Sequence, residues 1–249
     1  MISYTHGASD VPLIGEPIGE LLDRVAHVHA SHEAVVSVHQ GVRMTYGQLA
    51  KACNEVARGL MALGVGHGDR VGIWSTNNVE WVIVQFATAK IGAILVNVNP
   101  AYRTVELEYA LRQSGVSVLF SQGEYKTSDY LAMIEEVRDR LPELRSVIVI
   151  DGNARRDEDL RWGELRTIAE AIPPEQLALR QQATQFDEAI NIQYTSGTTG
   201  FPKGATLSHH NILNNGFFIG EGCRYTAADR VCIPVPFYHC FGMVLGNLA

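Results

Sequence analysis

The sequence predicts an α/β protein with a largely parallel sheet flanked by helices. Two observations lead to this fold class. Strand-like and helix-like segments alternate along most of the 249 residues, a pattern typical of parallel strands that are joined by helices and covered on both faces. The composition, 46% hydrophobic and 19% charged, is ordinary for a globular protein and supplies enough apolar residues for a buried core.

Helix and strand signals follow one another through the first 100 residues. Thr45 and Gln48 fit a capping box, so we expect a helix from there to about Leu63 with Gly64 as its C-cap. Apolar and polar residues alternate over 34–39, as in a half-buried strand. The other elements expected here are helices at 17–30 and 79–91 and strands at 71–75 and 93–98.

The same alternation continues over the next 90 residues. The expected elements are helices at 104–113 and 128–141 and strands at 116–121 and 146–151. Ser128 is the residue expected to open the second of these helices. The polar, charged stretch 151–159 is interpreted as an exposed loop, and the Pro- and Gln-rich stretch 173–187 as a connection rather than a core element.

The last quarter begins with a predicted strand at 189–194, which places Ile190, Ile192 and Tyr194 on one face. A turn rich in Gly, Thr and Ser follows. Ser208 is then expected to cap a helix through about Phe218. The unusual turn is therefore predicted to lie between a strand and a helix.

The charge of the chain argues against nucleic acid as a partner. The net charge is −7, the sequence pI is about 5.7 and no basic run is present, which also disfavours an anionic membrane surface. The most apolar stretch, 81–98, is interrupted by Gln85, Lys90 and Asn97, so it predicts a buried helix and strand instead of a transmembrane segment. Residues 1–15 match neither a secretory signal nor a transit peptide.

The cysteines and histidines suggest no metal site. The four cysteines, Cys53, Cys223, Cys232 and Cys240, include no C-x-x-C pair, so we expect free, buried thiols in a reducing compartment and a cytoplasmic protein. The four early histidines lack the spacing of a zinc site; they are His27, His29, His32 and His39. We expect His209 to be solvated at a helix start.

The turn at 195–204, TSGTTGFPKG, has the chemistry of a polyphosphate-binding loop. Its glycines allow the backbone to approach a ligand closely, and successive N–H groups in such a turn attract anions. Lys203 adds a positive charge. Hydroxyl groups that can donate to phosphate oxygens or approach a metal ion come from Thr195, Ser196, Thr198 and Thr199. The position of Lys203 does not fit a P-loop, because Gly204 follows it and Gly200 precedes it by three residues.

Residues 194–204 resemble the signature of the adenylate-forming superfamily, which includes acyl- and aryl-CoA synthetases, luciferases and the adenylation domains of peptide synthetases. The resemblance implies that this loop binds the phosphates of ATP, with Thr198 also approaching Mg²⁺. The implied ATP-binding residues are Thr195, Ser196, Gly197, Thr198, Thr199, Gly200 and Lys203.

Three further stretches are similar to motifs of the same superfamily. Residues 44–49 and 89–100 resemble its scaffold motifs, and residues 236–242 resemble a motif near the adenylate and the thiol tunnel. The last resemblance implies a catalytic role for His239. The residues around these motifs, above all 190–193 and 205–209, look most similar to the medium-chain fatty acyl-CoA synthetase branch.

The implied reaction has two steps. A carboxylic acid attacks the α-phosphate of ATP to give an acyl-adenylate, and the thiol of coenzyme A then displaces AMP. The implied ligands are therefore ATP, Mg²⁺, coenzyme A and a fatty or related acid. The sequence is also compatible with a homo-oligomer. Two alternatives remain: an enzyme of the superfamily that activates an aryl acid or an amino acid, and a non-catalytic protein that binds nucleotide or a partner.

The resemblance also implies that residues 1–249 are an incomplete large N-terminal AMP-binding domain, in which 173–187 is an internal connection. No counterpart is found for the superfamily's C-terminal domain, its Mg²⁺-binding glutamate or its ribose-binding aspartate. We therefore expect the isolated chain to be inactive and marginally stable, with an open sheet edge. The residues expected to lack packing partners are Met243, Val244, Leu245 and Leu248.

Overall fold

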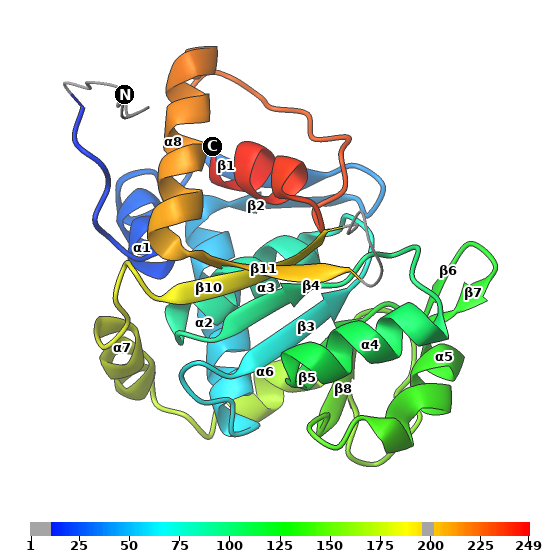
Figure 1. Ribbon diagram of the computed structural model, residues 1–249. Coiled ribbons are helices and arrows are strands. Elements are labelled where there is room, and N and C mark those ends of the chain that lie inside the picture. The colour runs from blue at the N-terminus through cyan, green and yellow to red at the C-terminus, as the bar shows by residue number, and fades with distance from the viewer. Residues whose placement is uncertain (1–10, 196–201) are drawn as a thin grey trace, which may run out of the picture.

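A seven-stranded sheet lies at the centre of the computed structural model, which describes residues 11–195 and 202–249 (Figure 1). Its strand order is β11-β10-β4-β3-β5-β8-β9, and each neighbouring pair is parallel except β10 with β11. The strands are β3 (Arg70–Trp74), β4 (Ile94–Asn97), β5 (Val116–Ser121), β8 (Ser146–Val149), β9 (Leu160–Arg161), β10 (Ala189–Thr195) and β11 (Lys203–Ser208). The predicted α/β class with a largely parallel sheet is confirmed.

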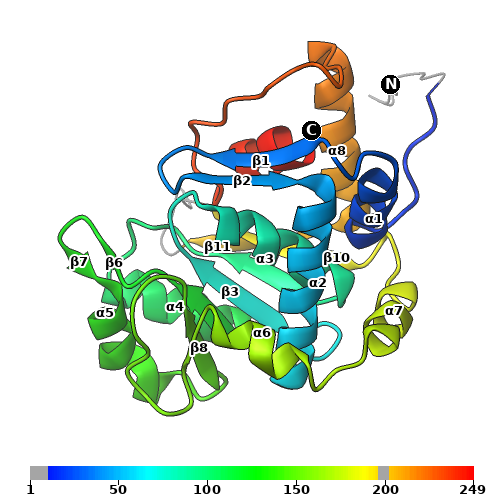
Figure 2. The same ribbon diagram turned by 180° about the vertical axis from the view of Figure 1, so that it is seen from behind.

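Helices cover both faces of this sheet, as Figures 1 and 2 show from opposite sides. The α-helices are α1 (Ile18–Val28), α2 (Tyr46–Ala62), α3 (Val79–Lys90), α4 (Thr104–Ser114), α5 (Tyr130–Val137), α6 (Glu164–Ala169), α7 (Pro174–Gln182) and α8 (His209–Cys223). A 3-10 turn, η1 (Arg138–Arg140), follows α5, and a π-helix, η2 (Phe241–Leu248), ends the chain. Two small hairpins are β1 (Glu33–Ser37) with β2 (Val42–Thr45), and β6 (Glu124–Tyr125) with β7 (Ser128–Asp129).

The local signals for helix ends act as predicted at several positions. Thr45 and Gln48 form the capping box of α2, in which each side chain bonds the other residue's backbone N–H. Ser208 caps α8 by accepting from the Asn211 N–H at 3.2 Å. Gly115 ends α4 with φ 64°, the left-handed conformation that glycine adopts most easily.

Three sequence predictions in the middle of the chain are wrong in detail. Asp129, and not Ser128, caps α5, because its carboxylate accepts from the Ala132 N–H at 2.8 Å. The stretch 173–187 contains the helix α7, which Pro174 begins well since proline suits the first helical turn. Asp159, at the end of the predicted exposed loop, is buried and pairs with Arg138 at 3.0 Å.

The sheet separates two apolar cores. One lies under α4 and α5, and the other lies under α1, α2, α3 and α8. Strand β10 contributes to both, and its pairing with β11 is irregular between Ala189 and Asn191. Ile190 packs into the core of α1–α3, whereas Ile192 and Tyr194 pack towards α4 and α5. The prediction that these three residues share one face is therefore wrong.

The end of the chain is packed better than expected. Met243 and Val244 are buried in the core that includes α1–α3, and Leu245 and Leu248 pack partly against it. The expectation that these residues lack partners is wrong. Among the described residues, no helix is long and apolar enough to cross a membrane.

The four cysteines are unpaired, as expected. Their burial differs from the prediction: Cys53 is buried, Cys240 is half-buried, and Cys223 and Cys232 are exposed. The two exposed cysteines lie in or after the last turn of α8, where few described residues cover the chain.

Candidate active site

The predicted phosphate-binding loop begins at the carboxyl end of β10, and it joins two antiparallel strands instead of a strand and a helix. Strand β11 was not predicted, and it pairs with β10 from Ala189–Ser208 to Thr195–Lys203. Five of the predicted ATP-binding residues lie outside the described residues; they are Ser196, Gly197, Thr198, Thr199 and Gly200. The described ends of the hairpin, Thr195 and Lys203, are both exposed.

The position of this hairpin is typical of a ligand site. Strand β10 is parallel to β4, so Thr195 and Asn97 end their strands at the same edge of the sheet. Ligands of open α/β sheets bind outside the carboxyl ends of the strands. The hydroxyl group of Thr195 donates a long hydrogen bond of 3.4 Å to the Lys203 carbonyl oxygen, which ties the two ends of the hairpin together.

Lys203 is a charge without a counter-ion in this structure. No acidic side chain among residues 11–195 and 202–249 forms an ion pair with it, although the chain carries a net charge of −7. An exposed lysine next to a glycine- and hydroxyl-rich loop suits an anionic ligand, because the ammonium group can move towards the anion. The hairpin ends therefore fit a polyphosphate.

Tyr194 fixes the end of β10 to helix α4. Its hydroxyl group lies 3.1 Å from the Ala110 carbonyl oxygen and 3.0 Å from Gln113 Oε1. Burial raises the pKa of the Tyr194 phenol, so the group stays protonated at neutral pH and donates. We assign Tyr194 a structural role in orienting the strand that leads into the loop.

His239, the predicted catalytic residue, is exposed on a tight turn that precedes η2. Its Nδ1 accepts from the Phe241 N–H at 3.2 Å, so in the neutral ring the proton lies on Nε2. Its carbonyl oxygen accepts from the N–H groups of Gly242 and Met243 at 2.9 and 3.0 Å. A Cβ at Gly242 would lie 2.4 Å from the Pro236 carbonyl oxygen, so the turn needs glycine there.

The segment 235–243, which comprises this turn and the first residues of η2, is held at the carboxyl edge of the sheet, and we call it the His239 turn. Asn77, which follows β3, donates to the Val235 carbonyl oxygen at 2.8 Å and accepts from the Phe237 N–H at 2.8 Å. Asn97, the last residue of β4, donates to the Tyr238 carbonyl oxygen at 3.2 Å. The structure thus brings His239 to the same edge as the β10–β11 hairpin.

Four buried amide side chains lie beneath this edge, three of them within hydrogen-bond reach of Met243, and we call them the amide cluster: Gln85, Asn97, Asn191 and Gln193. Each is less than 7% exposed. The sequence analysis did not assign them a role. The available signal was the interruption of apolar stretches by amides, since Gln85 and Asn97 break the run 81–98 and Asn191 and Gln193 alternate along β10.

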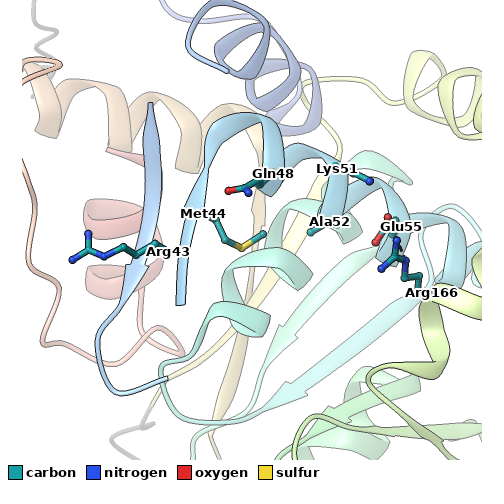
Figure 3. Close-up of a pocket in the computed structure, with 7 residues that line it drawn as sticks. All are labelled: Arg43, Met44, Gln48, Lys51, Ala52, Glu55 and Arg166. Carbon is teal, nitrogen blue, oxygen red and sulfur yellow. Dashed lines mark ion pairs between the residues drawn. The ribbon is translucent and has the colours of Figure 1, made fainter. Parts of the chain in front are cut away.

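The pocket in Figure 3 lies elsewhere, along α2, β2 and α6. Its volume is about 280 Å³, and it is lined by Arg43, Met44, Gln48, Lys51, Ala52, Glu55 and Arg166. Figure 3 shows Arg43 directed away from the other charged side chains, and Arg166 pairs with Glu55 at 3.7 Å. The charges do not converge on one point, so this pocket is a weaker candidate than the strand edge.

Neither a cluster of metal ligands nor a reactive cysteine is found among the described residues near this site. Within residues 11–195 and 202–249, no group of three His, Cys, Asp or Glu side chains could hold a metal ion; Thr198, the predicted Mg²⁺ contact, lies outside those residues. Burial raises the pKa of the Cys240 thiol beside His239, which disfavours a thiolate nucleophile there.

His209 differs from its prediction. The ring is buried instead of solvated, and its Nδ1 accepts from the Ile18 N–H at 3.1 Å. Burial lowers the pKa of His209 to about 4, with a smaller contribution from Glu188 that opposes this and one from His67 that adds to it. A neutral, buried ring that bonds α1 has a structural role.

Comparison with known proteins extends over nearly all of this chain. The sequence profile of the family described as AMP-binding enzyme matches residues 22–249. YngI of Bacillus subtilis, named as an acyl-CoA synthetase, is 43% identical over 95% of this chain and 45% of its own length. The mitochondrial medium-chain acyl-CoA ligase ACSF2 of Danio rerio is 40% identical over 99% of this chain and 43% of its own length.

The backbone is similar to those of solved ligases. The anthranilate CoA ligase AuaEII, crystallised with anthranoyl-AMP, superimposes with a TM-score of 0.79 and 27% identity, over 98% of this chain and 45% of AuaEII. The chain therefore spans less than half the length of the curated relatives and of this solved structure.

Proposed function

Because the chain belongs to the family of AMP-binding enzymes, we propose that it forms the ATP-phosphate-binding part of an acyl-CoA synthetase. The observation that carries this proposal is the β10–β11 hairpin, whose two ends frame the loop TSGTTGFPK at the carboxyl edge of the sheet. The exposed Lys203 beside it has no acidic partner among the described residues, and it is free to meet phosphate.

In the first proposed step, a carboxylate oxygen attacks the α-phosphorus of ATP and pyrophosphate leaves. Both reactants are anions, so the step needs cations and N–H donors where negative charge accumulates. Lys203 and the backbone and hydroxyl groups of residues 195–200 are proposed to supply them. Mg²⁺ would neutralise phosphate charge, and the Thr198 hydroxyl is the group of this chain proposed to approach it.

In the second proposed step, the thiol of coenzyme A attacks the acyl carbon and AMP leaves. The exposed His239 lies on a turn at the same sheet edge, and its Nε2 is free to carry or transfer a proton. We propose His239 as the residue that contacts the adenylate or the incoming thiol. The residues 1–249 are proposed to be part of the large AMP-binding domain of the enzyme.

For the acid, we propose a medium-chain fatty acid, supported by the 40% identity to a ligase of that name. We also propose a cytoplasmic location, which the four unpaired cysteines support because thiols persist in a reducing compartment.

ATP–pyrophosphate exchange tests the function. The assay compares octanoate with anthranilate on the 249-residue chain and on a chain extended to the length of its relatives. We expect octanoate-dependent exchange in the extended chain and none in the 249-residue chain. Exchange with anthranilate alone would replace the fatty acid by an aryl acid. No exchange with either acid in the extended chain would overturn the synthetase proposal.

Removal of the Lys203 charge tests the phosphate contact directly. We expect Lys203→Ala to raise the Kd for MgATP by about tenfold, the loss of one charge-assisted contact, measured by isothermal titration calorimetry. Lys51→Ala is the matched control, because Lys51 is an exposed lysine on α2 and far from the hairpin in sequence. Equal Kd values for the two variants would contradict the assignment of Lys203.

A further inference from the structure

We propose that Asn97 is a positioning residue: it fixes the His239 turn relative to the strand that leads into the phosphate loop. The inference rests on the proposed function, because the position of His239 relative to the loop matters only if both take part in that reaction. It concerns the amide cluster, which neither the sequence motifs nor the family resemblance assigns to the site. The argument begins with the contacts of Asn97.

Asn97 lies between the two parts of the site. It is the last residue of β4 and 1% exposed. On one side its Oδ1 accepts from Asn191 Nδ2 of β10 at 2.9 Å. On the other side its Nδ2 donates to the Tyr238 carbonyl oxygen at 3.2 Å, one residue before His239. The same amide nitrogen lies 3.5 Å from Met243 Sδ, after His239 in the chain.

The β10 side of this connection reaches almost to the loop. Asn191 Nδ2 also donates to the Leu95 carbonyl oxygen, and Asn191 Oδ1 accepts from Gln193 Nε2, both at 2.9 Å. Gln193 lies two residues before Thr195, the residue at which the described part of the hairpin ends. It also approaches Met243 Sδ, at 3.8 Å. A continuous series of amides therefore joins β10 to both sides of His239.

The direction of each hydrogen bond is determined. Since Asn191 uses its NH₂ group for the Leu95 carbonyl oxygen and for Asn97, its oxygen faces Gln193. Asn97 must then present its oxygen to Asn191, which leaves its NH₂ group for Tyr238. Aspartate at position 97 has no donor for Tyr238, and leucine bonds neither neighbour. The site requires both a donor and an acceptor at position 97.

Stability alone does not explain the cluster. A buried amide contributes little net free energy when it is fully bonded and is destabilising when it is not, whereas the neighbouring residue of β4, Val96, packs into the apolar core on the opposite face. Connected polar groups select one arrangement of the elements that carry them, because any other arrangement leaves donors unpaired. Here the elements are β4, β10 and the His239 turn.

The test compares two buried asparagines in the 249-residue chain. Asn97→Leu removes the connection. Asn214→Leu is the control: Asn214 is also buried, and it bonds the backbone N–H and carbonyl oxygen of Ile14 and the His210 carbonyl oxygen. Two readouts report on the turn: the ¹⁵N resonances of the His239 ring, and hydrogen exchange of the Gly242 N–H, which bonds the His239 carbonyl oxygen.

We expect Asn97→Leu to speed exchange at Gly242 at least tenfold beyond the change in global stability, and to shift the His239 resonances. We expect Asn214→Leu to leave both readouts as in the wild type. Equal behaviour of the two variants, or unchanged readouts in Asn97→Leu, would overturn the inference. If Asn97→Leu does not fold, Gln193→Met at the other end of the series is expected to give the same shift at His239, and no shift there would overturn it.

Addition of MgATP separates this inference from the proposed function. In the wild type we expect MgATP to slow exchange at Gly242, and in Asn97→Leu we expect this effect to be lost while MgATP still binds. If the wild type binds no MgATP, the proposal that residues 1–249 hold the phosphates of ATP falls, and the comparison of the free proteins still decides the role of Asn97. If MgATP slows exchange equally in both proteins, the inference is overturned although the function stands.

Discussion

The two faces of the central sheet differ in what they bury. The face under α4 and α5, the α4–α5 face, is packed by apolar and aromatic side chains, with Trp74 stacked on Tyr130 at 3.7 Å between ring centroids. The face under α1, α2, α3 and α8, the α1–α3 face, is also apolar at its centre, but it carries the amide cluster at its carboxyl edge and the neutral His209 beside α1.

The difference assigns separate tasks to the two faces. Apolar burial is non-directional and contributes about 25 cal/mol for each Å² removed from water, so the α4–α5 face mainly stabilises the sheet, and its polar contact with the hairpin strand is the Tyr194 hydroxyl group on α4. Buried amides are directional and contribute little net free energy, so the α1–α3 face places the segments of the proposed site. Substitutions on the two faces should therefore differ in whether they change stability, the site, or both.

The largest effect is expected on the α4–α5 face. Ile134 of α5 is 1% exposed, and Ile134→Ala should lower the free energy of unfolding by about 2–5 kcal/mol, because the removed methyl groups leave a cavity. Urea denaturation followed by circular dichroism measures the loss. The Kd for MgATP of the protein that remains folded should equal the wild-type value, since Ile134 lies on α5, whereas Tyr194 holds the hairpin strand through hydrogen bonds to α4.

Val105→Ala is the control for this prediction. Val105 lies on α4, which covers the same face, but it is 64% exposed, so its truncation should cost far less. A change in MgATP affinity in Ile134→Ala as large as the change expected for Lys203→Ala would break the comparison, because the apolar face would then also determine the site.

An intermediate effect is expected from pH on the α1–α3 face. Burial lowers the pKa of His209 to about 4 from its ordinary value of 6.5. Between these values the unfolded chain binds a proton that the folded protein does not. The contribution of His209 to the free energy of unfolding is therefore fully present above pH 6.5. It is lost as the pH falls towards 4, and the total loss is about 3 kcal/mol.

His209→Asn isolates this contribution, because an asparagine Oδ1 can accept from the Ile18 N–H in place of Nδ1 and does not titrate. Urea denaturation at pH 7, 6, 5 and 4 should give a shallower pH dependence for the variant than for the wild type. Identical curves for the two proteins would show that His209 is not buried in its neutral form.

The elements of the fold also differ in how far the sequence could predict them. Elements with local signals, such as the helix that Thr45 and Gln48 open or the one that Gly115 ends, occur within a few residues of their predicted bounds. Strand β11 was missed because the sequence KGATLS has few apolar residues. An edge strand does not need them when most of its side chains are exposed, as they are here. This strand is defined by its hydrogen bonds to β10. A local reading of the sequence does not reveal such pairing.

The same reason explains what could be predicted of the site. The phosphate chemistry proposed for residues 195–204 rests on ten consecutive residues, so it could be inferred from their composition alone. The amide cluster joins Asn97 to Asn191 and to Tyr238, across 94 and 141 positions. A polar residue in an apolar stretch marks a position as unusual, but its partner is known only once the strand order is known. His209 was mispredicted because a helix start is exposed in most proteins, and here α1 covers it.

The smallest effect is expected at the pocket in Figure 3, which lies on the outer side of α2. Arg166 is 72% exposed at its side chain and lies 3.7 Å from Glu55, and exposed ion pairs contribute little. Arg166→Ala should leave both the urea midpoint and the Kd for MgATP within error of the wild type. A several-fold weaker MgATP affinity would mean that nucleotide contacts this pocket, and the assignment of the site to the carboxyl edge of the sheet would then be wrong.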